Sequence, residues 1–566
     1  MEKEITWTLP VGVDSFTEIR EEKHYFVDKT MFISDFLKNK EKVTLITRPR
    51  RFGKTLNMSM MRDFFDITQN NIAIFEGLRI MNTEYAHMIN SRPTLYLTFK
   101  GVTGKNFDAL KLSLAHAVKE GYYKHATALN KSECEENEFF AIYKAFKKMD
   151  QETDTDKRKI DSDVLKRSLT VLIHRLYEHF QKPILLLIDE YDQPLIEAHA
   201  SNCREEFSSQ IYGPFLGDAL KGNESLGQSL LTGIQRVAKE SIFSKLNNVA
   251  VYTVADETYA TYFGLTETET KTALQDNGLK LLDSVKEYYD GYRIGDVDIY
   301  NPWSIINYMK RKKLEPYWVN TSTNLLARQL ILTADSEFFM DFETLIKEGE
   351  VDIFALLDAS FIELESTETI WGLLINAGYI TISKKIGMEE YVVRIPNFEV
   401  KKEFRTIVGL YTNIKASNLN GLFNALFDKN MNRFLMLYRK MILRHLSYHD
   451  IIDENSFHMF FLGMCMASQG FYQVMSNREM GHGRSDIGMK SLFTNDRPHI
   501  IIEFKTGKNV KKESENALEQ IFEKAYYSQF AGDVLCIGIG HDKKQCELVS
   551  RLIQVNEFGA IAPEIT

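Results

Sequence analysis

The sequence predicts an α/β protein in which a parallel sheet flanked by helices is followed by a small connector region and a second α/β domain. Short apolar runs alternate with helical patterns through the first half of the chain, which predicts the parallel sheet. A Gly-Lys-Thr turn directly after the first run predicts a phosphate-binding loop. Two apolar runs that carry acidic residues in register, near residues 486 and 503, predict the second domain.

Five apolar runs are expected to form the strands of the first sheet. They lie near residues 43 to 48, 94 to 99, 184 to 189, 228 to 233 and 249 to 254. Helical patterns separate these runs, and parallel strands need such crossover segments between them.

The phosphate-binding loop is expected at Arg48-Pro49-Arg50-Arg51-Phe52-Gly53-Lys54-Thr55. Backbone N–H groups at Gly53 and the following helix N-terminus would hold the phosphates of a nucleoside triphosphate. Lys54 would reach the β and γ oxygens, and the Thr55 hydroxyl would ligate Mg²⁺. Arg48 stands where such loops have their first glycine, and a Gly-Lys-Thr tripeptide also occurs by chance.

A second acidic feature supports the loop. The run from Pro183 to Ile188 has the composition of a buried strand and ends in Asp189 and Glu190. Asp189 would hold Mg²⁺ through water, and Glu190 would polarise an attacking water. The alternative is a core strand that ends in a solvated Asp-Glu pair.

Further polar residues near the strand ends are candidates for the nucleotide site. Thr232 or Arg236 could sense the γ-phosphate, or they could be a strand terminus and a surface arginine. Arg50 and Arg51 could neutralise triphosphate charge or act toward a neighbouring subunit. They could equally form a solvated basic turn.

A second group of candidate catalytic residues lies on two apolar runs, one around Asp486 and the other around Glu503. If these runs form an antiparallel hairpin with Asp486 opposite Glu503, the turn centres between Thr494 and Asn495, where turn-forming residues are found. The strand period of two then places Glu503 and Lys505 on one face, next to Asp486. Carboxylate oxygens suit Mg²⁺ or Mn²⁺, and the lysine could orient a water for attack on a phosphodiester. The alternative is a surface ion pair.

Three other polar residues are candidates for this second site. Glu454 could be a further acidic ligand, and His458, four residues later, a phosphate or water contact. Gln520 lies on a helical pattern and could position the nucleophilic water. A structural hydrogen bond competes with each of these roles.

Composition excludes some classes of protein. The net charge of −9 and the sequence pI near 5.9 exclude a globally basic nucleic-acid coat, so any DNA or RNA contact must come from local patches. The five cysteines form no metal-like cluster and are expected to be free thiols. The charged N-terminus and the absence of a long apolar stretch predict a cytoplasmic protein with no membrane partner.

At this point the motifs resemble known families. The first half resembles the AAA-ATPase-like family of bacterial and mobile-element proteins, through Phe26-Val27-Asp28-Lys29-Thr30, the arginine-rich loop, and Ile188-Asp189-Glu190-Tyr191-Asp192. The C-terminal part resembles the PD-(D/E)XK nuclease family, through Glu454-Asn455, Gly483-Arg484-Ser485-Asp486, Ile502-Glu503-Phe504-Lys505 and Gln520. The resemblance also covers Tyr289 to Arg293 and Tyr300 to Ser304, whose roles the sequence does not reveal.

The resemblance implies three domains. They are a P-loop AAA-ATPase-like domain at 1–300, a helical or winged-helix-like connector at 301–410, and a restriction-endonuclease-like α/β domain at 411–566. The leading hypothesis is an ATP-regulated or ATP-driven nuclease of mobile-element or defence biology, with DNA as the expected target and homo-oligomerisation open.

Two other hypotheses compete with the nuclease. One is a nucleotide-switched binding or signalling protein whose C-terminal domain does not cleave. The other is a small-molecule phosphotransferase, which is disfavoured because Asp189 and Glu190 favour water as the nucleophile.

Overall fold

A computed structural model describes the chain in two compact units. The first comprises residues 1–345 and 350–400, and the second comprises residues 346–349 and 401–566. The structure describes residues 7–129, 137–154, 158–236, 249–318, 334, 336–358, 366–411, 416–445, 457, 461, 464–465, 472–480, 483–492 and 497–562.

The first unit is built on a five-stranded sheet with the order β2-β3-β4-β1-β5, in which all neighbouring strands are parallel. The strands are β1 (Val43–Thr47), β2 (Thr94–Thr98), β3 (Ile184–Asp189), β4 (Leu226–Gly233) and β5 (Val249–Tyr252). All five predicted strands are therefore confirmed, and so is their parallel arrangement.

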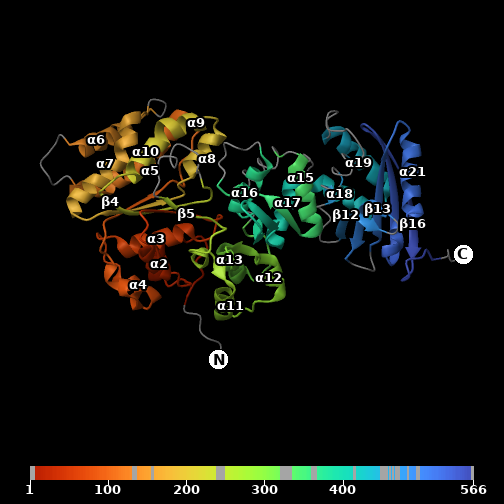
Figure 1. The fold of residues 1–566 in the computed structure, drawn as a ribbon, viewed down its shortest axis with the longest axis horizontal. Coiled ribbons are helices and arrows are strands. Elements are labelled where there is room, and N and C mark those ends of the chain that lie inside the picture. The colour runs from red at the N-terminus through yellow and green to blue at the C-terminus, as the bar shows by residue number, and fades with distance from the viewer. Residues whose placement is uncertain are drawn as a thin grey trace. The chain divides into compact units, whose positions relative to one another are not determined.

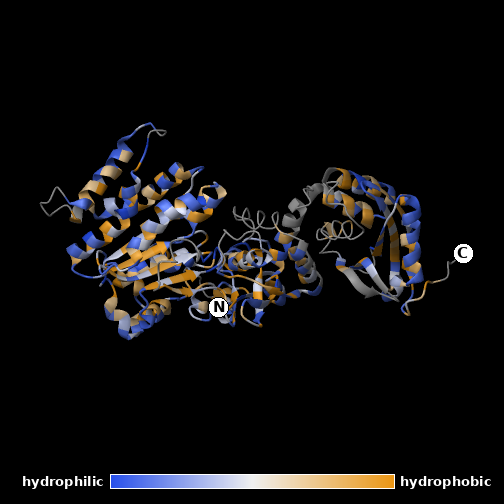
Figure 2. Cartoon of the chain, turned by 45° about the horizontal axis from the view of Figure 1, so that its top comes forward, coloured by the Kyte–Doolittle hydropathy of each residue, from blue (hydrophilic) through white to orange (hydrophobic). Residues whose placement is uncertain are grey.

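Helices cover both faces of this sheet (Figure 1). Those on one face are α5 (Phe107–Leu129), α6 (Glu138–Gln151), α7 (Ser162–Phe180) and α10 (Gly213–Leu220). Those on the other face are α1 (Phe16–Glu21), α2 (Met31–Asn39), α3 (Lys54–Phe65) and α4 (Ile72–Phe75). The strands are apolar on both sides because each face is buried: Leu186 packs into the first layer and Leu187 into the second. Figure 2 shows these strands as an apolar band.

Shorter helices complete the region around the sheet. They are α8 (Gln193–Ala200), α9 (Arg204–Phe207), the 3-10 helices η1 (Arg79–Asn82), η2 (Glu84–Met88) and η4 (Ala260–Tyr262), and the π-helix η3 (Ser208–Tyr212).

The rest of the first unit contains two small antiparallel sheets. One has the order β6-β8-β7, and the other has the order β10-β11-β9. Their strands are β6 (Leu265–Thr266), β7 (Tyr292–Ile294), β8 (Val297–Tyr300), β9 (Glu350–Phe354), β10 (Thr381–Lys385) and β11 (Glu390–Arg394). The described helices between residues 265 and 411 are α11 (Glu267–Asp276), α12 (Asp283–Tyr289), α13 (Pro302–Arg311), α15 (Ser336–Glu348), α16 (Thr367–Ala377) and α17 (Phe398–Tyr411).

Glu399 is a buried acid within this part of the first unit. Its carboxylate accepts hydrogen bonds from the backbone N–H of Trp318 at 2.5 Å and from the Ser304 hydroxyl at 2.8 Å. Burial raises the pKa of Glu399 from 4.5 to about 7, although these hydrogen bonds oppose the shift. The folded protein therefore holds a proton here that the unfolded chain releases near pH 4.5.

This shift predicts a pH dependence of stability. Between about pH 4.5 and 7 the folded state binds more protons than the unfolded state, so the stability contribution of Glu399 falls as pH rises. Glu399→Gln mimics the protonated acid and should stabilise the unit at pH 8 by roughly 3 kcal/mol, with little effect at pH 4.5. Thermal unfolding at both pH values, beside the exposed-site control Glu287→Gln, measures this difference. An equal shift at both pH values would contradict it.

The second unit contains a mixed five-stranded sheet with the order β12-β13-β14-β15-β16. Its strands are β12 (Tyr472–Met480), β13 (Gly483–Ser491), β14 (His499–Thr506), β15 (Gly532–Asp542) and β16 (Gln545–Val555). Only the β14–β15 pair is parallel, and its crossover contains α21 (Val510–Glu523) and the 3-10 helix η7 (Tyr526–Gln529). The other described helices are α18 (Ala416–Phe427) and α19 (Met431–His445). The predicted second α/β domain is confirmed.

The predicted register of the β13–β14 pair is observed. Ile487 pairs with Ile502 in an antiparallel ladder, so the next position along sets Asp486 opposite Glu503. Ile502 and Phe504 pack into the core shared with α18 and α19, whereas Ile501 packs on the α21 side. Glu503 therefore faces α21. The predicted turn at Thr494 and Asn495 lies outside the described residues.

Within the described part of the chain, no helix combines the length and apolarity needed to cross a membrane.

Candidate functional site

The phosphate-binding loop connects β1 to α3 at the carboxyl end of β1. The strand ends at Thr47, and the helix begins at Lys54. Gly53 lies immediately before the helix with φ 84°, a left-handed conformation that glycine adopts without steric cost. The loop therefore leads into the N-terminus of a 12-residue helix, where unpaired N–H groups favour anions.

Lys54 is folded back into this loop. Its Nζ donates hydrogen bonds to the carbonyl oxygens of Arg48 and Pro49, both at 2.9 Å. Burial lowers the pKa of Lys54, and the carboxylates of Glu190 and Asp189 oppose this effect. The ammonium group therefore lies within the phosphate-binding loop, and its acidic neighbours are the two carboxylates at the end of β3.

Asp189 brings three of the predicted residues together. Its Oδ2 accepts a hydrogen bond from the Thr55 hydroxyl at 2.7 Å, and its Oδ1 accepts one from the Thr232 hydroxyl at 2.7 Å. Asp189 and Thr232 are fully buried at the ends of β3 and β4. One carboxylate therefore connects the first turn of α3 with two neighbouring strands of the sheet.

The residues that follow Asp189 are held to the end of β4. Glu190 has φ 52°, a left-handed conformation that is uncommon for residues other than glycine. The buried Asp192 accepts hydrogen bonds from the N–H groups of Ile234 and Gln235, both at 2.8 Å, and burial raises its pKa. Sequence reasoning did not assign a role to Asp192, although it lies only three residues after Asp189.

Arg48, which replaces the first glycine of the usual loop motif, has a structural role. Its guanidinium is fully buried and donates to the carbonyl oxygens of Thr47, Tyr252 and Thr253 at 2.8, 3.1 and 2.7 Å. Burial lowers the pKa of Arg48 to about 9, while Asp256 opposes the shift. The side chain therefore attaches the start of the loop to β5 and the segment after it.

The other predicted arginines contact protein groups. The guanidinium of Arg51 lies over the Trp303 ring, 4.3 Å from its centroid, and Arg236 lies 3.5 Å from Asp358 in a partly exposed ion pair. The backbone carbonyl of Arg50 accepts a hydrogen bond from the Trp318 indole at 2.9 Å. The structure thus places Arg50 and Arg51 in the loop and Arg236 just beyond β4.

The second candidate site lies where β13 and β14 stop pairing. Beyond the Ile487–Ile502 pair, side-chain carboxylates instead of backbone carbonyls accept the hydrogen bonds between the two strands. The Phe504 N–H donates to Asp486 Oδ2 at 2.7 Å, and the Asp486 N–H donates to Glu503 Oε2 at 3.1 Å. Each carboxylate is therefore oriented by a backbone donor of the opposite strand.

Lys505 and Gln520 complete the described part of this second site. Gln520 on α21 donates to Glu503 Oε1, and the Lys505 ammonium lies 4.0 Å from the same oxygen. Gln520 also donates to the Tyr526 hydroxyl at 3.2 Å, and burial raises the pKa of this tyrosine. Sequence reasoning assigned no role to Tyr526. Glu454 and His458 lie outside the described residues.

The oxygen donors of this site suit a hard divalent cation. An ionised carboxylate offers about four lone-pair sites, so the backbone bonds that orient Asp486 and Glu503 leave acceptor capacity for a cation. A separate compact group of metal-ligating types, Glu18, Glu22 and His24, lies at the surface around α1. Exposed acidic groups of this kind are common without a metal, and we assign no role to it.

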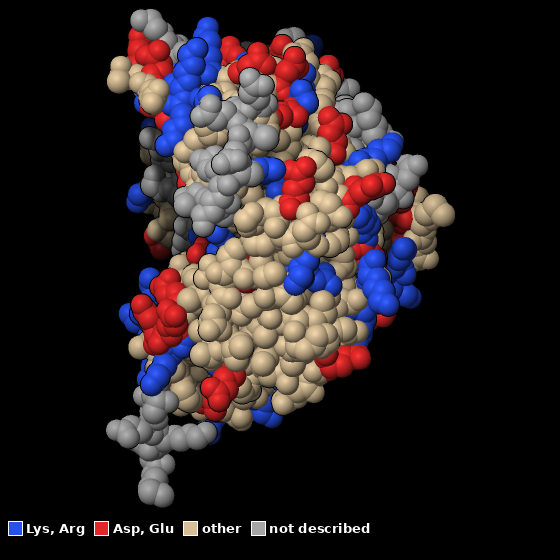
Figure 3. Space-filling model, turned by 90° about the vertical axis from the view of Figure 1, so that its left-hand side faces the viewer, with Lys and Arg blue, Asp and Glu red and all other residues tan. Residues whose placement is uncertain are grey.

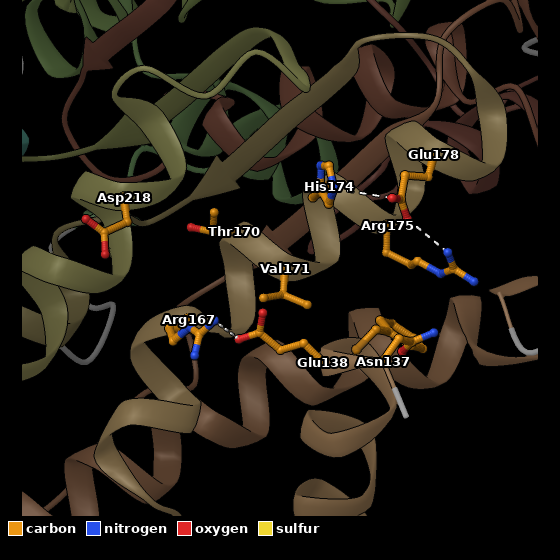
Figure 4. Close-up of a pocket in the computed structure, with 10 residues that line it drawn as sticks. Asn137, Glu138, Arg167, Thr170, Val171, His174, Arg175, Glu178 and Asp218 are labelled. Atoms are coloured by element: carbon orange, nitrogen blue, oxygen red, sulfur yellow. Dashed lines mark hydrogen bonds and ion pairs between the residues drawn. The ribbon is translucent and has the colours of Figure 1, made fainter. Parts of the chain in front are cut away.

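A surface pocket is formed by α6, α7 and α10, and none of residues 48–55 lines it. Figure 4 shows Glu138 paired with Arg167, and Glu178 in contact with both His174 and Arg175. These ion pairs therefore neutralise most of the charge on the side chains that line the pocket. On the face shown in Figure 3, basic and acidic side chains are also intermingled around uncharged residues.

Comparisons with known proteins agree with this arrangement. Residues 10–243 match the family described as "Predicted AAA-ATPase", and residues 452–551 match the PD-(D/E)XK nuclease superfamily. Both resemblances expected from the sequence are therefore confirmed in one chain. A relative described as "Uncharacterized protein in vnfD 5'region", from Azotobacter chroococcum mcd 1, is 27% identical over 408 residues, which cover 69% of this chain and 68% of the relative.

Proposed function

We propose that this protein binds and hydrolyses ATP and uses its C-terminal domain to cut nucleic-acid phosphodiesters, with DNA as the target. The observation that carries the proposal is that the chain pairs a phosphate-binding loop joined to Asp189 with a second site formed by Asp486, Glu503 and Lys505. The two family matches on the same chain support both halves. The division into residues 1–300, 301–410 and 411–566 is part of the proposal.

At the first site, backbone groups at Gly53 and the N-terminus of α3 would hold the triphosphate, and Lys54 would contact its β and γ oxygens. Arg50 and Arg51 would add positive charge. Thr55 and Asp189 would hold Mg²⁺, which neutralises developing phosphate charge. Their hydroxyl and carboxylate lie 2.7 Å apart and are oxygen donors of the kind that Mg²⁺ requires.

Hydrolysis at this site needs a water in line with the γ-phosphate. Glu190 would orient and polarise that water, since it directly follows Asp189 at the end of β3. Thr232 would sense the γ-phosphate through Asp189, with which it shares a hydrogen bond of 2.7 Å. Arg236 is the second candidate sensor and would have to leave its ion pair with Asp358 to act.

At the second site, Asp486 and Glu503 would hold Mg²⁺ or Mn²⁺, with Glu454 as a further ligand or orienting group. The metal would supply positive charge to the scissile phosphate. Lys505 would orient the nucleophilic water and help to accept its proton, and Gln520 would position Glu503 and the water. The contacts of Gln520 and Lys505 with the same Glu503 oxygen support these roles.

The proposal includes a cytoplasmic location and leaves homo-oligomerisation to measurement. The free cysteines among the described residues, Cys203, Cys465, Cys536 and Cys546, fit a reducing compartment. Sedimentation with and without a non-hydrolysable ATP analogue measures the oligomeric state.

Incubation of the purified protein with linear, circular and single-stranded DNA tests the function. The assay contains Mg²⁺ or Mn²⁺, is run with and without ATP, and includes the Lys505→Ala variant. We expect wild-type products that disappear in the variant. ATP hydrolysis without cleavage under any condition would instead favour the nucleotide-switched binding protein.

A further inference from the structure

The motifs without an assigned role, Tyr289 to Arg293 and Tyr300 to Ser304, lie against the phosphate-binding loop. Trp303 holds the guanidinium of Arg51 over its ring at 4.3 Å. The ring of Tyr292 packs edge-on against Phe52, with centroids 5.0 Å apart. Two neighbouring loop residues are therefore held by these motifs.

A second tryptophan and a glycine extend the same contact. Trp318 donates its indole N–H to the carbonyl of Arg50 at 2.9 Å. Gly378, which ends α16, approaches Pro49 so closely that an added Cβ would lie 2.8 Å from the Pro49 Cβ. The loop is thus contacted along its length, from Pro49 to Phe52, by residues that follow the ATPase-like match.

Arg51 needs such support because of its backbone conformation. Its φ of 68° lies in the left-handed region, which is strained for a residue other than glycine. A strained conformation persists only where surrounding contacts determine it. Lys54 bonds to the carbonyls of Arg48 and Pro49, so a change at Arg51 would also disturb the groups that position this lysine.

We propose that Trp303 and Trp318, here named the tryptophan clamp, are positioning residues of the nucleotide site that hold residues 50 and 51 in the conformation that binds triphosphate. This inference rests on the proposed ATP binding at the loop. It assigns a role to the Tyr300 to Ser304 motif, because Asn301 caps the N-terminus of α13 through a hydrogen bond from the Ser304 N–H and so orients Trp303. The clamp makes the segment after residue 300 part of the nucleotide site.

Two substitutions of Trp303 separate the aromatic contact from simple packing. Trp303→Leu removes the ring face that attracts Arg51, whereas Trp303→Phe keeps it. We expect Trp303→Leu to weaken ATP binding roughly three- to fivefold in calorimetry, in keeping with a cation–π contact of an exposed arginine. Trp303→Phe should remain within about twofold of wild type. Equal losses in both variants, or no loss in either, would overturn the inference.

A double-mutant cycle tests whether Trp303 acts through Arg51. In the Arg51→Met background, Trp303→Leu should add little further loss, because the cation is already absent. Independent, additive losses would overturn the proposed route. Wild-type protein that binds no ATP would refute the ATPase proposal itself, and this result appears before any variant is compared.

Tryptophan fluorescence tests the clamp by a measurement that requires neither enzymatic activity nor a folded leucine variant. ATP or ADP should change the emission of wild type and of Trp7→Phe, since Trp7 contacts Asn277 and Tyr25 instead of the loop. The change should disappear when Trp303 and Trp318 are both replaced by phenylalanine. A nucleotide-dependent change that survives this double replacement at full amplitude, and so arises from Trp7 or Trp371 instead of Trp303 and Trp318, would overturn the clamp.

Discussion

Lys54→Ala is expected to abolish ATP binding at the phosphate-binding loop. The substitution removes the ammonium that would contact the β and γ oxygens and leaves the carbonyls of Arg48 and Pro49 without their donor. Hydrogen bonds to charged groups contribute about 1.5–3 kcal/mol each, so the Kd for ATP should rise roughly a hundredfold or more. Calorimetric titration with Mg²⁺ and ATP measures this change.

Two controls make the Lys54 result specific. Lys54→Met keeps the length of the side chain but lacks the charge, and it should lose affinity to a similar extent. Lys38→Ala removes an exposed lysine from α2 and should leave binding unchanged. ATP binding by Lys54→Ala with wild-type affinity would show that the nucleotide binds elsewhere on the protein.

The elements that sequence reasoning identified correctly are those with a strong local pattern. The central strands β1 and β3 are buried along their whole length and consist largely of apolar residues, and such runs remain recognisable without knowledge of the fold. The Asp486–Glu503 register followed from strand periodicity and the position of turn residues. Local chemistry was therefore sufficient to predict the residues that the structure brings together around Asp189 and around Glu503.

The missed features depend on contacts between residues far apart in the chain. Arg48 was recognised only as a departure from the glycine motif, because its carbonyl partners at 252 and 253 lie at the end of β5 and just beyond it, about 200 positions away in the chain. Trp303 lies 252 positions after Arg51 along the chain, and nothing in either local pattern indicates that they meet. Such pairings are set by tertiary packing and have no periodic signal.

Asp192 was missed for another reason. In the Asp-Glu-Tyr-Asp sequence, the first two acids stand at the strand end, where metal-binding and water-polarising groups are expected. Nothing in the local pattern distinguishes the last acid. The later aspartate binds the backbone after β4 and so fixes the segment that carries Arg236. Its role becomes apparent only when β3 and β4 are known to be neighbours.

Glu503→Gln is expected to abolish cleavage while ATP hydrolysis stays within about twofold of wild type. The amide keeps the size of the side chain, which is almost fully buried, but removes the charge that would hold the cation beside Asp486. Loss of one charge-stabilising group at a reacting centre costs about 10²–10³ in rate, so DNA cleavage should fall by roughly that factor or more. Gel analysis of DNA products measures it together with phosphate release from ATP.

The outcome of Glu503→Gln also separates the two halves of the protein. Glu519→Gln, an exposed substitution on the same helix as Gln520, should cleave as wild type does, since it removes a carboxylate that lies at the surface. Because the loop and the Asp486–Glu503 pair belong to different compact units, loss of cleavage with retained hydrolysis would mean that ATP turnover does not need the second site. Cleavage by Glu503→Gln at the wild-type rate would instead require another set of ligands for the reaction and would remove the main support for Asp486 and Lys505 as its partners.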